Sequence, residues 1–256
     1  MPHSQTLAAP AKLTLSLRIT GVRPDGYHLI DAEMVSLDLV DQVVITPADA
    51  TTLAVAGPYA DGIPLDSNNL VARALELADR TAHVTIHKRI PHGGGLGGGS
   101  SDAAAVLRWA GWAPTPQALV LAATIGADVA YCLAGGRARV RGIGEIVDPL
   151  PAVAMTVTLV VPPLQVSTPA VYQAWDHLGG PTADGPNDLE AAAVHLYPEL
   201  ERWRDRIGDV CGTRPTLAGS GATWFVPGEH EEALVTLSEK ERGNEGANVI
   251  VARTIV

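Results

Sequence analysis

Glycine is unusually dense in the segment GGGLGGG at residues 93–99, which Ser100 and Ser101 follow directly. Glycine costs backbone entropy and weakens an adjoining helix, so its repeated use here needs a reason. A helix that begins among small residues leaves its first backbone N–H groups free to converge, and its N-terminus carries partial positive charge. The pattern therefore favours a loop that binds an anion, such as the phosphates of a nucleotide.

Other interpretations of this loop are weaker. Gly93, Gly95 and Gly98 satisfy the dinucleotide-binding spacing G-x-G-x-x-G. That site needs an acidic residue roughly 20 positions further on, and residues 103–127 contain none. A Walker A loop needs lysine before its serine or threonine, where this chain has Gly99. A plain surface turn does not explain why the glycines run straight into a serine-capped helix.

The composition limits the possible partners. The net charge of −10 argues against nucleic acid and against anionic membranes, because both are bound through basic surfaces. A phosphate-bearing ligand must therefore be bound locally, by backbone amides and a few cations. The longest apolar run, at residues 155–161, is far shorter than a membrane helix. Cys132 and Cys211 provide no disulfide framework, so we expect a cytoplasmic protein with no membrane partner.

Strands and helices flank the loop in the first half of the chain. Leucine and isoleucine alternate with polar residues in KLTLSLRIT at residues 12–20, which predicts a half-buried strand. Further strands are expected at residues 42–46, 52–56 and 83–88. Helices are expected at residues 67–80 with Ser67 or Asn68 as cap, from about 101 to 110, and from Thr115 to near Gly126.

The second half is expected to start after DPLPAVA at residues 148–154, which divides the chain into domains of residues 1–150 and 151–256. Short strands near 137–141 and 145–147 precede this segment, and a strand at 155–161 follows it. Helices are expected after Thr168-Pro169, after NDLE at 187–190 with its capping-box spacing, and at 229–242. Strands flank AGSGA at 218–222, and NVIVARTIV closes the chain. This mixture predicts an α+β fold in two halves.

Four segments, in this order along the chain, resemble the GHMP kinases. They are APAKLTLSLRITGVRPDGYHLIDAEMVSLDLVDQV, PHGGGLGGGSSDAA, IGADVAYCLAGG and LAGSGATWFV, and together their arrangement spans most of the chain. The resemblance is greatest to the branch that acts on 4-diphosphocytidyl-2-C-methyl-D-erythritol. It implies the two-domain GHMP kinase fold, with a ribosomal-protein-like N-terminal domain that binds ATP and a ferredoxin-like α+β C-terminal domain.

In that branch, ATP phosphorylates the 2-hydroxyl of its substrate in the non-mevalonate synthesis of isoprenoid precursors. The resemblance thus implies ATP and Mg²⁺ as cofactors and a small-molecule substrate that carries cytidine diphosphate; we expect a monomer or weak homodimer. It gives an ATP-binding role to Asn69, Pro91, Gly93, Gly94, Gly95, Leu96, Gly97, Gly98, Gly99, Ser100 and Ser101. Ser101 is also the candidate contact for Mg²⁺, which prefers oxygen ligands. A helix cap explains Asn69 equally well.

The resemblance also names a catalytic pair. Lys12 by itself reads as a solvated lysine at the end of a strand, and Asp128 as an ordinary loop or cap residue. Their positions within the motifs PAK and GADV imply, by the resemblance, that Lys12 is the catalytic lysine and Asp128 the catalytic acid–base residue. AGSGA, on its own a tight connection between strands, becomes a third motif that approaches the site from the second domain.

Substrate-binding roles follow in the same way. Tyr27 and His28 lie where the family holds the cytosine by stacking and by hydrogen bonds to the base edge, and Tyr172 lies where a second aromatic ring belongs. The remaining positions that match the substrate site are Thr14, Thr168 and Pro169. An aromatic residue that stacks on a base contributes ~1–3 kcal/mol.

The chain departs from the family pattern at several places. Thr14 replaces the usual asparagine, His92 an apolar residue and Asp102 an asparagine, and AYC at residues 130–132 replaces a proline followed by two aromatic residues. Asp102 near phosphates would repel them, although at a helix N-terminus its charge also complements the helix dipole. Three alternatives stay open: a GHMP kinase of the mevalonate or homoserine type, a non-catalytic nucleotide-binding module of the same fold, and the less favoured nucleotide-dependent oxidoreductase. Tyr27-His28 disfavours the first, and Lys12 with Asp128 the second.

Overall fold

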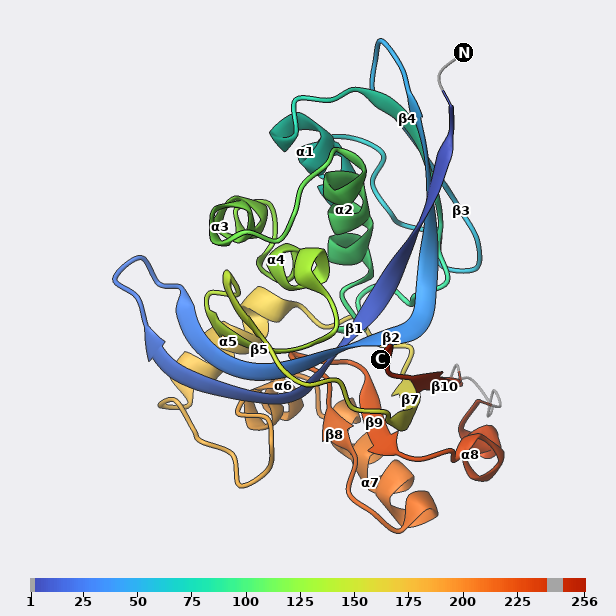
Figure 1. Cartoon of the computed structure of the whole chain (residues 1–256). Coiled ribbons are helices and arrows are strands. Elements are labelled where there is room, and N and C mark those ends of the chain that lie inside the picture. Colours follow the sequence, from blue (N-terminus) through green and yellow to red (C-terminus); the bar gives the residue numbers. More distant parts are fainter. Residues whose placement is uncertain (1–2, 239–245) are drawn as a thin grey trace.

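The computed structural model describes residues 3–238 and 246–256, which form two sheets flanked by helices (Figure 1). The first sheet has the order β3-β4-β2-β5-β6, with β1 paired to β2, and the second has the order β10-β7-β9-β8. The strands are β1 Gln5–Val22, β2 His28–Pro47, β3 Thr52–Ala56, β4 Ala82–His87, β5 Arg137–Gly142, β6 Ile146–Pro149, β7 Thr156–Val161, β8 Thr216–Leu217, β9 Trp224–Pro227 and β10 Asn248–Arg253. The helices are α1 Leu70–Leu77, α2 Gly98–Trp109, α3 Pro116–Ala123, α4 Ala127–Ala134, α5 Thr168–His177, α6 Glu190–Leu196, α7 Glu199–Cys211 and α8 Glu231–Ser238. Within these described residues, no helix combines the length and the apolar composition that a membrane span requires.

A long antiparallel ribbon of β1 and β2 runs through the N-terminal half (Figure 1). β4 pairs with residues 42–47 of β2, whereas β5 pairs with residues 30–35, so β2 changes its partner along its length. The register of the ribbon shifts between Pro10 and Lys12 and again between Thr14 and Ser16. Such bulges re-aim side chains, and here they bracket Lys12 and Thr14, which are only 5% and 2% exposed. This end of the polar face of β1 is therefore buried.

Helix α2 fills the space between this ribbon and the helices α1 and α4 (Figure 1). Residues 101–107 of α2 are all buried, and the small side chains of Ala103, Ala104 and Ala105 allow close approach on every side. The helix starts at Gly98, three residues earlier than expected, and its N-cap is Gly97 in the left-handed conformation. Gly98 and Gly99 therefore belong to the first turn of the helix as well as to the glycine segment.

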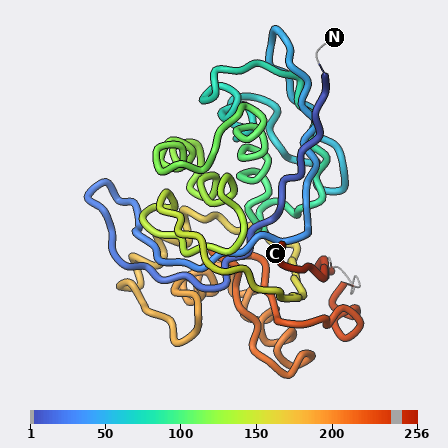
Figure 2. The backbone as a smooth tube through the Cα atoms, viewed as in Figure 1, coloured from blue at the N-terminus to red at the C-terminus, as the bar shows by residue number. Residues whose placement is uncertain are grey.

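One apolar cluster joins the two sheets. Leu13 of β1 and Leu37 of β2 belong to the same buried cluster as Leu159 of β7 and Phe225 of β9. The end of the chain returns to the ribbon, where the backbone N–H of Ile255 donates to the carbonyl of Ser36 at 2.9 Å. The tube in Figure 2 shows the C-terminus beside the ribbon, next to segments about two hundred residues earlier in the chain. The position of β1 is thus fixed by both halves.

The structure corrects several of the expected element boundaries. Asn69, not Ser67 or Asn68, caps α1, and Ser167 caps α5. The NDLE segment makes no capping box, because the N-cap of α6 is Leu189 and it has no side-chain cap. Residues after Gly126 form α4, which was not expected. The helix expected at 229–242 is observed at Glu231–Ser238, and residues 239–242 lie outside the described residues.

Candidate active site

A cavity of about 560 Å³ lies between the β1–β2 ribbon, the glycine segment and the helices α4 and α5. Its lining comes from both halves of the chain. It includes every residue that the sequence suggested for catalysis or for substrate binding, namely Lys12, Thr14, Tyr27, His28, Asp128, Thr168, Pro169 and Tyr172. Of the suggested ATP-binding residues, Gly95 and Ser100 line it.

Lys12 and Asp128 form an ion pair in this cavity. The Lys12 Nζ lies 3.3 Å from Asp128 Oδ2 and donates a hydrogen bond of 3.1 Å to Thr14 Oγ1. The lysine side chain is 6% exposed and the aspartate side chain 34%. Asp128 lies in the first turn of α4, where its carboxylate complements the helix dipole. The pair therefore presents an ammonium group, largely removed from water, and an accessible carboxylate side by side.

The glycine segment needs its glycines because other groups come very close to its backbone. A Cβ on Gly97 would lie 2.6 Å from Lys12 Cγ, and a Cβ on Gly95 would lie 2.5 Å from the carbonyl oxygen of Ala218. Both glycines also have positive φ angles, of 68° and 78°. The segment is thus packed between the stem of Lys12 and the AGSGA loop of the second half. Its conformation is fixed by these contacts.

The two serines after the glycines face different surroundings. Ser100 lines the cavity, whereas Ser101 is buried and its Oγ has no hydrogen-bond partner in the described part of the chain. Asn69 serves as the cap of α1: its Oδ1 accepts from the N–H of Val71 at 2.9 Å and its Nδ2 donates to the carbonyl of Pro64 at 2.7 Å. Asn69 does not line the cavity, and the cap function that the sequence allowed is present in the structure.

Asp102 points away from the cavity into a buried charged cluster with Lys88 and Asp41. Lys88 Nζ donates to Asp102 Oδ2 at 2.7 Å and to Asp41, and Asp41 Oδ1 accepts from the backbone N–H of Ile90 at 2.8 Å. Burial, against the opposing effect of Lys88 and with a smaller contribution from the charge of Asp41, raises the pKa of Asp102 to about 7. The cluster ties the start of α2 to β2 and to the segment before the glycines. Because Asp102 points away from the cavity, the structure gives no support to the expected repulsion between Asp102 and bound phosphates.

Aromatic side chains line the other end of the cavity. The rings of His28 and Tyr172 lie 4.7 Å apart, centroid to centroid, with 36° between their planes. Tyr27 also lines the cavity and is 60% exposed, so a ligand in the cavity can reach it. Burial raises the pKa of the Tyr172 phenol, and the charge of Asp128 raises it further, so the phenol stays protonated.

The sequence interpretation missed several residues of this site. Gln173 and Asp176 line the cavity, as does Ser220 of the expected AGSGA motif, whose Oγ lies 2.8 Å from Thr168 Oγ1. Asn187 supports the AGSGA loop from outside: its Nδ2 donates to the carbonyls of Leu217 and Gly219 at 2.8 Å and 2.7 Å. Asp176 could have been found from its spacing, because it lies one helical turn after Tyr172. Asn187 gave no such signal, since its partners are backbone groups 30 and 32 residues away.

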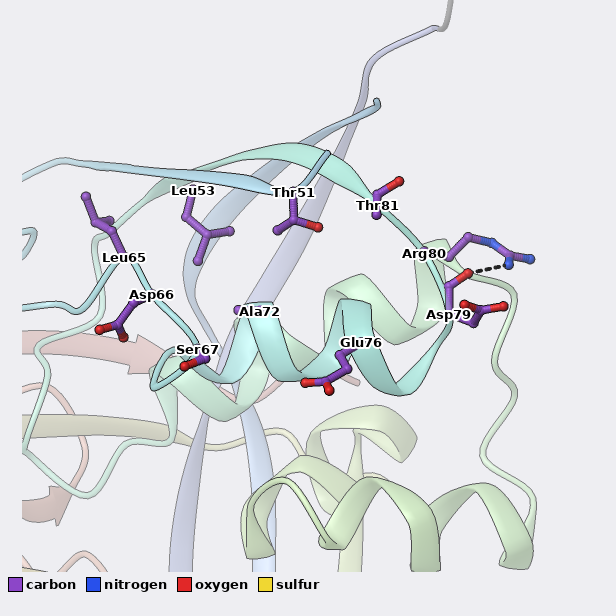
Figure 3. A pocket seen from close by; sticks show the side chains of 10 residues that line it. All are labelled: Thr51, Leu53, Leu65, Asp66, Ser67, Ala72, Glu76, Asp79, Arg80 and Thr81. Carbon is purple, nitrogen blue, oxygen red and sulfur yellow. Dashed lines mark hydrogen bonds between the residues drawn. The ribbon is translucent and has the colours of Figure 1, made fainter. Parts of the chain in front are cut away.

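A second cavity, of about 600 Å³, lies beside α1 (Figure 3). Figure 3 shows Ala72 and Glu76 on α1, with Leu53 and Thr51 on the segments above the helix. Its lining contains none of the residues suggested for catalysis or for substrate binding. Three of its residues are acidic, Asp66, Glu76 and Asp79, and one is basic, so it offers no concentration of positive charge for phosphates. The site therefore lies at the first cavity.

Comparisons with known proteins agree with this site. Residues 69–136 match the model of the GHMP kinases N terminal domain. A 4-diphosphocytidyl-2-C-methyl-D-erythritol kinase from Paracoccus denitrificans is 42% identical over 245 residues, which cover 88% of this chain and 87% of that protein. A similar kinase from Cereibacter sphaeroides is 39% identical, covering 90% of this chain and 92% of that protein.

Solved structures show the same relationship. The crystal structure of a 4-(cytidine 5'-diphospho)-2C-methyl-D-erythritol kinase superposes with a TM-score of 0.72 at 33% identity, covering 98% of this chain and all of that one. A homoserine kinase from Cytophaga hutchinsonii shares the fold, with a TM-score of 0.63 at 17% identity, 100% of this chain and 96% of that one. The α+β fold expected from the sequence is thus confirmed as the GHMP kinase fold. With this identity over nearly its whole length, the chain belongs to the family of 4-diphosphocytidyl-2-C-methyl-D-erythritol kinases.

Proposed function

We propose that this protein transfers the γ-phosphoryl group of ATP to the 2-hydroxyl of 4-diphosphocytidyl-2-C-methyl-D-erythritol, a step in the non-mevalonate synthesis of isoprenoid precursors. One observation carries the proposal. A single cavity combines the Lys12–Asp128 ion pair with an aromatic end formed by Tyr27, His28 and Tyr172, and the glycine segment lies at its side. Phosphoryl transfer needs the pair and the glycine segment, and a cytidine substrate needs the aromatic end.

The ion pair suits the transfer of a phosphoryl group to an alcohol. The hydroxyl oxygen attacks the γ-phosphorus, the bond from that phosphorus to the β–γ bridging oxygen breaks, and ADP leaves. Asp128 is accessible from the cavity and takes up or orients the hydroxyl proton. Lys12 Nζ stabilises negative charge that develops on the transferring oxygens, and its burial strengthens that effect.

The start of α2 suits the ATP phosphates and Mg²⁺. Its first backbone N–H groups have no partner within the helix, and the helix dipole favours an anion there. The described residues contain no group of three or more His, Cys, Asp or Glu side chains that could hold a metal ion by themselves. Mg²⁺ would therefore be held by phosphate oxygens together with the hydroxyl of Ser100 or of Ser101, whose Oγ lacks a partner within the same residues. When bound, it neutralises phosphate charge.

We propose that residues 1–150 form the domain that binds ATP and that residues 151–256 form a second domain that closes the substrate side. The ATP-site candidates all precede residue 150, whereas Thr168, Pro169 and Tyr172 come from α5. The free thiols of Cys132 and Cys211 are compatible with a reducing cytoplasm, which is the compartment we propose.

A substrate panel with ATP and Mg²⁺, followed by ADP release, tests the proposal. We expect turnover with 4-diphosphocytidyl-2-C-methyl-D-erythritol and at least about 100-fold lower kcat/KM with mevalonate or homoserine, which have no base for the aromatic end. Equal turnover of mevalonate or homoserine would contradict the substrate but not the phosphoryl transfer. Absence of ADP release with every member of the panel would indicate a non-catalytic nucleotide-binding module.

A further inference from the structure

Three side chains on one face of α5 surround the imidazole of His28. Tyr172 lies against the ring at 4.7 Å, and Trp175 meets it edge-on with centroids 5.6 Å apart and 85° between the planes. The third, Asp176, accepts a hydrogen bond of 2.8 Å from His28 Nε2. Their spacing of three and four residues places all three on the same side of the helix. The imidazole comes from β2 in the first half of the chain, so this contact crosses between the halves.

The contact with Asp176 determines where the imidazole carries its proton. An ionised carboxylate only accepts hydrogen bonds, so Nε2 must be the N–H donor of this pair. In the neutral ring, the other nitrogen, Nδ1, is then an acceptor. Nδ1 has no hydrogen-bond partner within residues 3–238 and 246–256, and His28 lines the cavity. The site thus contains one unused acceptor among its aromatic rings.

The surrounding groups keep the ring and its partners in place. Trp175 Nε1 donates to the carbonyl of Pro181 at 2.9 Å, which fixes the indole. Tyr172 packs against the main hydrophobic core. The His28 side chain is only 9% exposed, whereas the Asp176 side chain is 46% exposed. Rotation of the imidazole would break the bond to Asp176 and displace the ring from two aromatic neighbours.

We propose that Asp176 is a positioning residue that gives the cavity its preference for cytosine over uracil. It holds His28 as the Nε2–H tautomer, and Nδ1 then accepts a hydrogen bond from the exocyclic amino group of cytosine. Uracil has a carbonyl oxygen at that ring position, so acceptor would face acceptor. This inference rests on the proposed function, because it deepens the role of the aromatic end of the same site.

Binding of cytidine diphosphate and uridine diphosphate, measured by calorimetry at pH 8, tests this inference. We expect the unaltered protein to bind cytidine diphosphate at least about tenfold more tightly, because a mispaired acceptor loses a hydrogen bond and stays desolvated. The variant Asp176→Ala should bind cytidine diphosphate about fivefold to tenfold more weakly and uridine diphosphate with less than about twofold change. Asp176→Asn should restore part of the preference, because its amide oxygen still accepts from Nε2.

Asp209→Ala is the matched control, because Asp209 is an exposed aspartate of α7 that does not line the cavity. It should leave both affinities unchanged. A tautomer-sensitive ¹H–¹⁵N spectrum of His28 gives a readout independent of binding: the Nε2–H form should dominate in the unaltered protein and mix with the Nδ1–H form in Asp176→Ala.

The outcomes separate the inference from the function on which it rests. If the unaltered protein binds neither diphosphate, both the cytidine substrate and the role of Asp176 are wrong. If it prefers cytidine diphosphate and Asp176→Ala keeps the same ratio of affinities, or loses both affinities equally, only the role of Asp176 is wrong. An unchanged tautomer in a folded Asp176→Ala protein would also overturn it.

Discussion

At the scale of single residues, the site depends on a charged pair whose members come from different elements. Lys12 reaches the cavity because β1 bulges on both sides of it, and Asp128 reaches it from the first turn of α4. Neither position looks unusual in its local sequence. Their closest contact, 3.3 Å between Lys12 Nζ and Asp128 Oδ2, arises only after the elements pack.

Replacement of Asp128 by asparagine should abolish most phosphoryl transfer in a folded protein. Asparagine keeps the shape but can neither take up a proton nor balance the charge of Lys12, and loss of a general base costs ~10²–10⁴ in rate. ATP affinity should survive, because the glycine segment is untouched. We would measure kcat, ATP affinity and Tm for Asp128→Asn, for Lys12→Met and for both together. The combined loss should be smaller than the product of the two single losses, because the residues act as a unit.

The exposed Asp209→Asn is the control for this series and should keep normal turnover. Near-normal kcat in a folded Asp128→Asn protein would show that Asp128 has no part in the reaction.

Asp102 should make stability depend on pH. Its pKa is raised from 3.8 to about 7 in the folded protein, chiefly by burial, so the folded state binds more protons than the unfolded state between those values. The free energy of unfolding therefore falls as pH rises through that window, by at most about 1.4 kcal/mol for each pH unit. In Asp102→Asn, denaturant unfolding between pH 4 and pH 7 should show a flatter decline than in the unaltered protein. Parallel curves for the two proteins would mean that Asp102 is ionised throughout this range.

At the scale of elements, the conformation of the glycine segment before α2 depends on the backbone groups that pack against it. Gly95 combines a φ of 78° with backbone oxygens of Ala218 and Gly221 at 2.5 Å and 2.9 Å from the position of a Cβ. Gly62 has a similar φ of 77°, but no atom of the residues that the structure describes lies within 4 Å of that position. Alanine substitutions at these two positions therefore separate the energetic cost of the positive φ angle from the cost of a steric clash between the new Cβ and neighbouring backbone.

Gly95→Ala should lower ATP affinity at least about tenfold and reduce Tm, because the AGSGA loop must move away from the glycine segment. Gly62→Ala should cost only the conformational term, about 1–2 kcal/mol of stability, and leave ATP affinity unchanged. Calorimetric ATP titration and thermal melts of both variants would check this. Equal effects of the two substitutions would show that the contact with the AGSGA loop is unimportant.

The sequence predicted some elements well and others poorly, for physical reasons. β3 lies at Thr52–Ala56 as expected, and Thr115 caps α3, because these signals are local. Most of β2 was missed because Asp31 and Glu33 interrupt its apolar pattern, and their partners, Arg139 and Arg137, lie on β5. α4 was missed because the expected stop near Gly126 is followed at once by another helix.

The residues of the site also divide into those that the sequence indicated and those that it did not. Lys12, Asp128 and Tyr172 line one cavity, as the resemblance to the family predicted. Their spacing in the sequence alone did not predict that they would lie together. Asp176 and Asn187 were not found, because each acts through a partner that is distant in sequence: His28 for Asp176, and the AGSGA backbone for Asn187.

At the scale of the whole molecule, the two halves form one site because they share both a core and a cavity. The shared apolar cluster holds β7 and β9 against the ribbon, and so brings the AGSGA loop to the glycine segment and α5 to His28. The first half supplies the ion pair and the loop that suits phosphates, and the second supplies Tyr172 and the residues around it. The lining of this one cavity therefore comes from both halves of the chain, as the proposed use of two substrates requires.

The position of the transferred phosphoryl group tests this account most directly. The protein would be incubated with ATP, Mg²⁺ and 4-diphosphocytidyl-2-C-methyl-D-erythritol, and the product examined by phosphorus and carbon NMR. We expect one new phosphomonoester, on the 2-hydroxyl, formed in equal amount to ADP, and no such product from Asp128→Asn. ADP released without a phosphorylated cytidine product, or a phosphate on another hydroxyl, would contradict the account.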